Sequence, residues 1–209
     1  MQNKALGFGT LILFVAFSYL VHKDIFTQID FDMTVKIQDK IPRTVDYIFS
    51  LLSLIGSVEA VGIMLVVLFF FMNKLRYLFV LASFGLFHFI EIFGKVFVHH
   101  PPPPFLFSRY ALDLSFPSSY VRPGSSYPSG HAGRTAFLAA VLFVLIWQSK
   151  KFSLNLKIVL SAVLLAFSFL MFVSRVYLGE HWTSDVLGGV LLGASLGLIS
   201  SSLMPQAKN

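Results

Sequence analysis

The stretch SRVYLGEHWTSD, residues 174–185, joins two apolar segments at 157–175 and 184–203, each long enough to cross a bilayer. It contains an arginine, a glutamate, a histidine and an aspartate. Ionisable residues at membrane depth are costly unless they are paired or functional. The stretch therefore predicts a membrane protein with a functional site at one membrane face.

The composition of the whole chain agrees with this prediction. The 209 residues are 56% hydrophobic and 12% charged, whereas soluble domains contain about 25% charged residues. Because the chain has no cysteine, it has no disulfides, thiolate metal sites or cysteine nucleophiles. We predict an all-α membrane protein with a single domain, residues 1–209. Its six predicted transmembrane helices are 5–21, 56–72, 77–97, 130–148, 157–175 and 184–203.

Two segments allow alternatives. Residues 5–21 have the length of a secretory signal peptide, but no small-residue cleavage site follows, so we expect an uncleaved anchor. Residues 43–55 are amphipathic and either lie in the membrane interface or lengthen the second span.

The positions of lysine and arginine orient the predicted bundle. The short segments 1–4, 73–76, 149–157 and 204–209 contain basic residues and no acid. These basic residues are Lys4, Lys74, Arg76, Lys150, Lys151, Lys157 and Lys208. Since such loops stay on the cytoplasmic side, we expect both termini to be cytoplasmic. The ends of spans three and five and the starts of spans four and six then lie on the outer face.

The sequence PSGH, residues 128–131, opens the fourth span. Ser129 is a suitable N-cap, and Gly130 allows backbone to approach a ligand closely. Free N–H groups at a helix N-terminus bind anions, and His131 lies in that first turn. The alternative is a capped helix start with an interfacial histidine.

His181 and Asp185 are four residues apart around the start of the sixth span, where Thr183 or Ser184 can act as the cap. At this spacing the carboxylate can accept a proton from one ring nitrogen, which orients the imidazole and raises its basicity. The alternative is a purely structural contact at a helix cap.

Together these motifs resemble the type-2 phosphatidic acid phosphatase superfamily of membrane lipid phosphatases. PSGH matches its second motif, and S-R-x5-H-x3-D, its third, is matched by Ser174, Arg175, His181 and Asp185. The resemblance covers residues from about 90 to 190. It implies phosphohistidine chemistry at the outer ends of helices 3–6, without a metal or a cofactor.

The resemblance also implies a role for each motif residue. His181 would be the nucleophile, Asp185 would orient it, and His131 would protonate the leaving group. The residues that would hold the phosphoryl oxygens are Lys95, Ser129, Gly130 and Arg175.

The first motif of the family, K-x6-R-P, is incomplete here. Lys95 is followed by VFVHHP and then by Pro102 and Pro103, so proline stands where the family has arginine. We predict that Arg109, from the same loop, replaces it, and that Arg122 contributes less. The alternative is that both are ordinary loop arginines.

Several further polar residues have weaker interpretations. We expect His99 and His100 to be interfacial, with phosphate contact as the alternative. Glu91 shares a helix face with His88 and Lys95 and can position the lysine, and Arg134 lies one turn after His131. The small residues Gly189, Gly193 and Gly197 form a stripe typical of helix packing.

The predicted reaction is hydrolysis of a phosphomonoester or diphosphate headgroup on a membrane lipid. The candidate substrates are an isoprenyl diphosphate, phosphatidylglycerol phosphate and phosphatidic acid, met at the outer face of a bacterial inner membrane. We expect no nucleic-acid partner. The alternatives are a lipid phosphotransferase with the same intermediate and a non-catalytic lipid-binding or scrambling relative, which the missing arginine favours.

Overall fold

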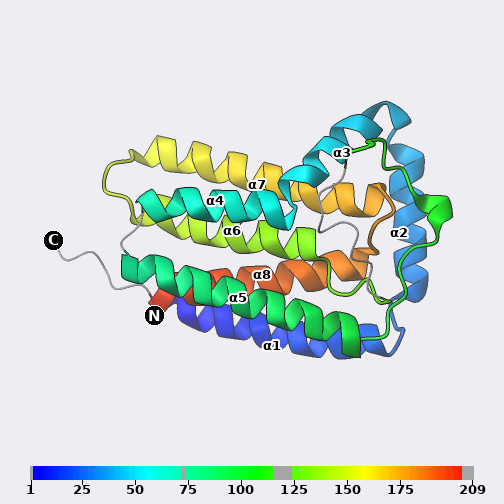
Figure 1. Ribbon diagram of the computed structural model, residues 1–209, viewed down its shortest axis with the longest axis horizontal. Coiled ribbons are helices and arrows are strands. Elements are labelled where there is room, and N and C mark those ends of the chain that lie inside the picture. Colours follow the sequence, from blue (N-terminus) through cyan, green and yellow to red (C-terminus); the bar gives the residue numbers. More distant parts are fainter. Residues whose placement is uncertain (1, 72–73, 115–123, 204–209) are drawn as a thin grey trace.

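The computed structural model describes residues 2–71, 74–114 and 124–203, and within them every regular element is helical. The prediction of an all-α protein is confirmed. The helices that run side by side along the long axis are α1 (Gln2–His22), α4 (Val58–Phe71), α5 (Lys74–Phe97), α6 (Gly130–Gln148), α7 (Leu154–Tyr177) and α8 (Thr183–Leu203) (Figure 1). The helix α2 (Thr27–Lys40) stands across one end, where α3 (Asp46–Ile55) and the short 3-10 helices η1 (Arg43–Val45) and η2 (Phe105–Phe107) also lie.

Five helices in the described part of the chain are long and apolar enough to span a membrane: Lys4–His22, Tyr77–Phe97, Gly130–Gln148, Leu154–Tyr177 and Thr183–Ser201. The predicted second span, 56–72, differs from the structure. Segments Arg43–Ile55 and Val58–Phe70 qualify only together, and they meet at a bend of 51°. The carbonyl of Gly56, at this bend, accepts a hydrogen bond from Arg134 Nε at 3.0 Å, so the bend is tied to α6.

The helix α8 lies at the centre, packed against α6, α1 and α5. Its glycines allow this close packing. A Cβ on Gly193 would lie 2.0 Å from the Gly133 carbonyl oxygen, and one on Gly197 would lie 2.7 Å from that of Phe137. The interpretation of the glycine stripe as a helix-packing face is confirmed.

The six predicted spans do not include α2, which lies between the first and second of them. Asp30 of α2 is buried and accepts hydrogen bonds from Ser184 N at 2.8 Å and Ser184 Oγ at 2.6 Å. Gln38 donates at 2.8 Å to the carbonyls of Phe107 and Tyr177. These contacts hold α2 across the helix ends that carry the motifs. The start of α1 and the end of α8 lie at the opposite end (Figure 1).

Candidate active site

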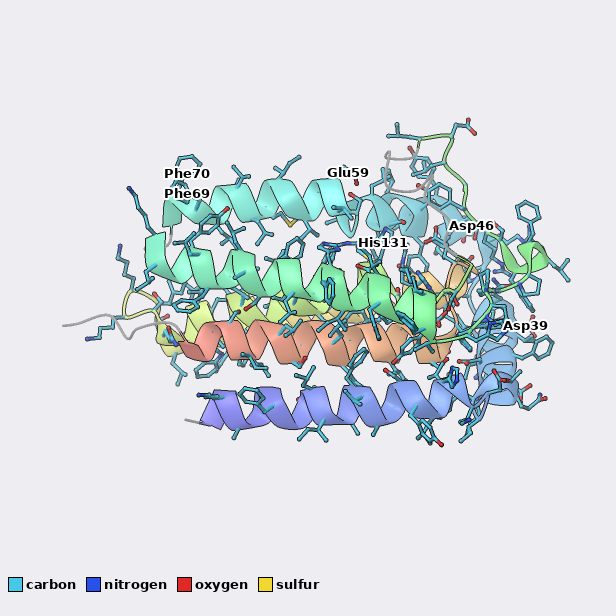
Figure 2. All side chains as sticks on the ribbon, turned by 60° about the horizontal axis from the view of Figure 1, so that its bottom comes forward. Asp39, Asp46, Glu59, Phe69, Phe70 and His131 are labelled. Atoms are coloured by element: carbon cyan, nitrogen blue, oxygen red, sulfur yellow. The ribbon has the colours of Figure 1, made fainter. Side chains whose placement is uncertain are left out.

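The motif residues meet at the end of the bundle that α2 covers (Figure 1). Lys95 lies in the last turn of α5, Arg175 in the last turn of α7, and His131 in the first turn of α6. His181 precedes α8, and Asp185 is in its first turn. Figure 2 shows His131 towards this end of the molecule, whereas Phe69 and Phe70 lie at the other end of α4.

The start of α6 is joined to the start of α8. Ser129 Oγ accepts a hydrogen bond from Ala132 N at 3.5 Å, which confirms Ser129 as the N-cap. Ser129 N donates to the backbone carbonyl of Asp185 at 2.9 Å. A Cβ on Gly130 would lie 2.1 Å from Glu91 Oε1, so the close approach at this glycine is to a carboxylate of α5.

The carboxylate of Asp185 is fully buried and contacts two imidazoles. Its Oδ2 lies 3.5 Å from His181 Nδ1 and accepts a hydrogen bond from Trp182 N at 2.9 Å. Its Oδ1 lies 2.7 Å from His100 Nδ1. The predicted His181–Asp185 pair is therefore within ion-pair distance. His181 Nδ1 has no hydrogen-bond partner among the described residues, so the pair has to tighten before Asp185 can accept a hydrogen bond from His181 Nδ1–H.

Arg134 determines which nitrogen of His131 can carry the proton. Its Nη2 lies 3.5 Å from His131 Nδ1. Because a guanidinium only donates hydrogen bonds, Nδ1 must be the acceptor in this contact. The remaining proton of a neutral His131 is then on Nε2, where it can be donated to another group.

Glu91 is the buried acid among the cations on this side. Its Oε2 lies 3.1 Å from His88 Nδ1 and 3.5 Å from Arg134 Nη1, and its Oε1 lies 3.9 Å from Lys95 Nζ. The predicted Glu91–Lys95 pair is confirmed. Lys95 Nζ also donates to the Pro128 carbonyl at 3.2 Å, so the lysine points at the PSGH segment.

Arg175 is fully buried and has an internal acidic partner. Its Nη1 donates at 2.6 Å both to Glu180 Oε2 and to Ser53 Oγ. Its Nε and Nη2 both donate to Ser174 Oγ, at 3.2 and 3.1 Å. Glu180 and Ser53, which no sequence motif singled out, both contact the arginine of the third motif.

The structure places Arg109 away from the motif histidines. Its Nη1 donates to the Ile41 carbonyl at 3.4 Å, and its guanidinium lies over the Tyr177 ring, 5.0 Å from the centroid. No contact between Arg109 and the histidines or Lys95 is present in the described part of the chain. The role predicted for Arg109 therefore stays a prediction, and Arg122 lies outside the described residues.

His100 is the main residue that sequence reasoning missed. We expected an interfacial histidine, which fits the exposed His99 but is wrong for His100, which is 5% exposed. Burial lowers the pKa of His100, but its hydrogen bond to Asp185 and the negative charges of Asp185 and Asp30 outweigh this, and the pKa is raised. The available signal was its position, five residues after Lys95 and directly before four prolines.

Two curated proteins are similar to this chain in sequence. YbjG of Escherichia coli (strain K12), by name a candidate undecaprenyl-diphosphatase, is 36% identical over 119 residues, which are 57% of this chain and 44% of that protein. The undecaprenyl-diphosphatase of Sulfolobus acidocaldarius is 33% identical over 102 residues, 44% of this chain and 45% of that protein. The chain thus spans less than half the length of these curated relatives.

Two solved structures share the fold. A phosphatidylglycerolphosphate phosphatase of the PAP2 type from Bacillus subtilis has a TM-score of 0.76 at 20% identity, covering 94% of both chains. LpxE of Aquifex aeolicus has a TM-score of 0.60 at 26% identity, covering 81% of this chain and 93% of that one. The sequence itself matches the PAP2 superfamily over residues 73–208. Because that match takes in well over half of the chain, from α5 onward, the protein belongs to the PAP2 superfamily.

Proposed function

We propose that the protein is an integral membrane phosphatase that removes phosphate from a lipid headgroup through a phosphohistidine. The observation that carries this proposal is the meeting of both histidine motifs at one site. Ser129 N, two residues before His131, donates to the backbone carbonyl of Asp185 at 2.9 Å, and His181 faces the buried carboxylate of Asp185. This set supplies a nucleophile, a proton donor and cations for the phosphoryl oxygens.

Cations and backbone donors form the proposed phosphate grip. Lys95, Arg175 and the N-terminus of α6 at Ser129 and Gly130 would contact the phosphoryl oxygens. Positive groups held in a buried site stabilise the charge that develops in the transition state. The carboxylate of Glu180 moves off the guanidinium of Arg175 when the phosphate binds.

In the first step, His181 Nε2 attacks phosphorus while Asp185 accepts the hydrogen bond from Nδ1–H. A P–N bond forms, and the P–O bond to the lipid breaks in line with it. His131 enters this step as the imidazolium, with its Nδ1 contact to Arg134 opened, and transfers its Nε2 proton to the departing oxygen. His131 becomes a neutral imidazole, and the lipid leaves as a neutral hydroxyl or a protonated phosphate.

In the second step, His131 accepts a proton from water with the nitrogen that has just lost one. The resulting hydroxide attacks phosphorus, the P–N bond breaks, and inorganic phosphate leaves. His181 and His131 return to their starting states, so the cycle consumes one water for each phosphate released.

A lipid substrate is supported by an apolar groove beside His131. A cavity of about 180 Å³ lies between α4, α6 and α7, next to Thr135, one turn along α6 from His131. A second cavity of about 250 Å³ continues it between α4 and α6, and the two share Met64, Leu138 and Leu142. A hydrocarbon chain in this groove would place its headgroup phosphate at His131.

Among the candidate lipids, a polyprenyl diphosphate has the strongest support. Both curated relatives carry undecaprenyl-diphosphatase names. The phosphatidylglycerolphosphate phosphatase of Bacillus subtilis shares the fold alone at its level of identity. Phosphatidylglycerol phosphate and phosphatidic acid are therefore the secondary candidates for this chain.

One observation favours a second candidate function, a non-catalytic lipid-binding relative. Pro102 has replaced the first-motif arginine, which removes one bidentate phosphate donor. The test is release of inorganic phosphate by the purified full chain in detergent, from undecaprenyl diphosphate, phosphatidylglycerol phosphate and phosphatidic acid, with and without EDTA. We expect EDTA-insensitive release from the diphosphate without any acceptor lipid.

Each other result of this assay has a definite meaning. Release that depends on an added acceptor would identify a phosphotransferase. No release from any lipid, with binding retained, would identify the non-catalytic relative. Activity lost in EDTA and restored by magnesium would contradict the proposed grip.

We also propose that the site faces the outside of a bacterial inner membrane, with both termini in the cytoplasm. The proposal is supported by the basic segments at the end opposite α2. In this cysteine-free chain, Asp39→Cys on exposed α2 should react with an impermeant maleimide in intact cells, whereas Lys151→Cys should react only after permeabilisation. The reverse pattern would place the site in the cytoplasm.

A further inference from the structure

His100 is held between two carboxylates that come from different helices. Its Nδ1 lies 2.7 Å from Oδ1 of Asp185, at the start of α8. Its Nε2 lies 3.7 Å from Oδ2 of Asp30, in α2. All three side chains are buried, with exposed fractions of 5% for His100, 2% for Asp30 and 0% for Asp185.

The backbone around His100 is also fixed. The carbonyl of His100 accepts hydrogen bonds from Ser126 N at 2.9 Å, Ser126 Oγ at 3.1 Å and Ser125 Oγ at 3.2 Å. Tyr127 alone separates these serines from the PSGH segment. The imidazole therefore sits on a strongly anchored part of the loop, and its orientation is set by the fold.

His100 and His181 differ in the groups that their ring nitrogens face. Both nitrogens of His100 face carboxylates, so neither is free to attack phosphorus. His181 faces Asp185 with Nδ1 alone. Asp185 is nevertheless closer to His100 than to His181. The distance from a carboxylate oxygen to Nδ1 is 2.7 Å for His100 and 3.5 Å for His181.

We propose that His100 is a positioning residue for the phosphoryl-transfer reaction. It holds Oδ1 of Asp185 so that the other carboxylate oxygen faces the nucleophile, and it links Asp185 to Asp30, which is bonded to the first turn of α8. The inference rests on the proposed phosphatase function. In metal sites, residues that orient a ligand through a hydrogen bond cost about 10- to 100-fold in activity when they are lost, and we expect a loss in the same range for the residue that orients Asp185.

His100 also places a positive charge on the carboxylate that the nucleophile needs. The acidic groups that act on His100 are Asp185 from α8, Asp30 from α2 and Asp24 from the α1–α2 turn. The ring of Tyr127 packs edge-on at 6.5 Å. A protonated His100 neutralises part of the negative charge of Asp185, so the charge that the nucleophile faces depends on the proton of His100.

Two substitutions separate these effects. His100→Phe keeps an aromatic ring and removes both nitrogens. His100→Asn keeps an N–H donor near the position of Nδ1 but removes the charge and the reach to Asp30. The matched control is His99→Phe, on the adjacent exposed residue. We expect kcat for the undecaprenyl diphosphate assay to fall roughly 10- to 100-fold in His100→Phe with KM within about twofold, to recover to within about fivefold of wild type in His100→Asn, and to stay unchanged in His99→Phe.

The pH profile gives a readout that a merely structural role would not move. In His100→Asn the acid limb of kcat/KM should shift to higher pH by about 0.5 unit or more, because Asp185 is no longer neutralised. If His100→Phe does not fold, this profile decides alone. Equal losses in both variants, or an unshifted acid limb in His100→Asn, would overturn the inference. Absence of phosphate release by the wild type would instead refute the proposed function.

Discussion

At the scale of single residues, the two motif histidines differ in their partners. His181 faces a carboxylate through Nδ1, whereas His131 faces the guanidinium of Arg134. We predict that His181→Ala retains less than about 1% of wild-type phosphate release, since losing a covalent nucleophile costs several orders of magnitude. With p-nitrophenyl phosphate, His131→Ala should accumulate a phosphoenzyme, because this leaving group needs no proton.

The measurement is phosphate release together with acid-labile, alkali-stable labelling of the protein by substrate phosphate. His99→Ala, on an exposed histidine, is the matched control and should behave as wild type. Turnover by His181→Ala above about 1% would show that another group attacks phosphorus.

Glu180 is a second residue whose charge has a testable consequence. Its carboxylate occupies Arg175 Nη1 at 2.6 Å, so a phosphate has to compete with it. Glu180→Gln keeps the shape and removes the competing charge. We predict that inorganic phosphate inhibits this variant about tenfold more tightly, since a charge-assisted bond to arginine is exchanged for a weaker one.

The inhibition constant for phosphate measures the effect directly, and gel filtration in detergent checks the fold. Weaker phosphate inhibition in a folded Glu180→Gln protein would mean that the carboxylate holds Arg175 in place for the substrate. Leu187→Gln, on an exposed apolar position of α8, should leave the constant unchanged.

Residue contacts were predictable where they are local in sequence. The Ser129 cap, the Glu91–Lys95 pair and the His181–Asp185 pair all lie within four residues, where helix geometry fixes which side chains meet. His100 and Asp185 are 85 residues apart. No helical period links them, so only the packed fold shows that His100 shares the carboxylate of Asp185 with His181.

At the scale of elements, the loop after α5 contains Arg109, which we predict replaces the missing first-motif arginine. Arg109 lies over the ring of Tyr177 at the end of α7. Tyr177 is two residues after Arg175 in the sequence. We predict that Arg109 leaves the ring to contact the phosphate, so that Arg109→Ala costs roughly 100-fold or more in kcat/KM. Arg122→Ala should cost much less, and Arg109→Lys should not restore activity, because an ammonium cannot replace a planar bidentate donor.

Steady-state kinetics of these three variants test the prediction, and the structure of a vanadate complex would locate the guanidinium. Normal activity of Arg109→Ala would leave the grip to Lys95, Arg175 and the α6 N-terminus. Arg134 would then be the remaining guanidinium beside His131.

A separate prediction concerns the apolar groove between α4, α6 and α7. Leu138 lines both cavities, so Leu138→Trp should block the path of a lipid chain. We expect KM for undecaprenyl diphosphate to rise about tenfold, because one obstructed apolar contact is worth roughly 1–3 kcal/mol. KM for a short, water-soluble phosphate ester should not change.

The matched control is Leu165→Trp, on a lipid-facing position of α7 that is 61% exposed. It should leave both KM values unchanged. An equal rise for long and short substrates in Leu138→Trp would mean that the substitution distorts the site, and no rise for either would place the chain elsewhere.

Elements were predictable where their apolar length alone determines them. The long spans of α1 and α5 to α8 follow from hydrophobic runs, with boundaries within a few residues of those predicted. The helix α2 has a mixed polar sequence and is held by Asp30 and Gln38 across distant parts of the chain. The bend before α4 lies at Gly56 and Ser57, a pair typical of helix breaks, where Ser57 Oγ accepts a hydrogen bond from Ala60 N at 3.1 Å. The contact of Arg134 with the Gly56 carbonyl joins residues 78 apart, so it could not be predicted from local sequence.

At the scale of the whole molecule, α2 lies across the functional end, while the start of α1, the start of α5 and the connection between α6 and α7, which contain basic residues, lie at the opposite end (Figure 1). The density of Lys and Arg in short loops predicts that these basic segments lie on one side of the membrane and the motifs on the other. The closure by α2 was not predictable, because it depends on a buried aspartate that meets Ser184 from 154 residues away. The same closure buries His100 beside Asp30, so the stability of the whole fold depends on the protonation of groups under α2.

The pH dependence of unfolding follows from these buried groups. The pKa of His100 is raised, because the bond to Asp185 and the acidic charges outweigh burial, and burial raises the pKa of Asp30. A group with a raised pKa in the folded state binds its proton more tightly there than in the unfolded chain. The stabilisation from this proton is complete below the pKa of the group in the unfolded chain, about 6.5 for histidine. It is lost as the pH rises through the pKa of the group in the folded state.

We therefore predict that the apparent Tm in detergent falls by a few degrees as the pH is raised from about 6 to about 8.5, across the histidine range. Much of this fall should disappear in His100→Asn, which cannot take up a proton, whereas His99→Asn should retain it. Asp30 contributes in the same direction but over a more acidic range, so Asp30→Asn should flatten the profile mainly below pH of about 6. A Tm that rises with pH in the wild type, or a slope that His100→Asn leaves unchanged, would mean that His100 is not the group whose proton stabilises the closed end of the bundle.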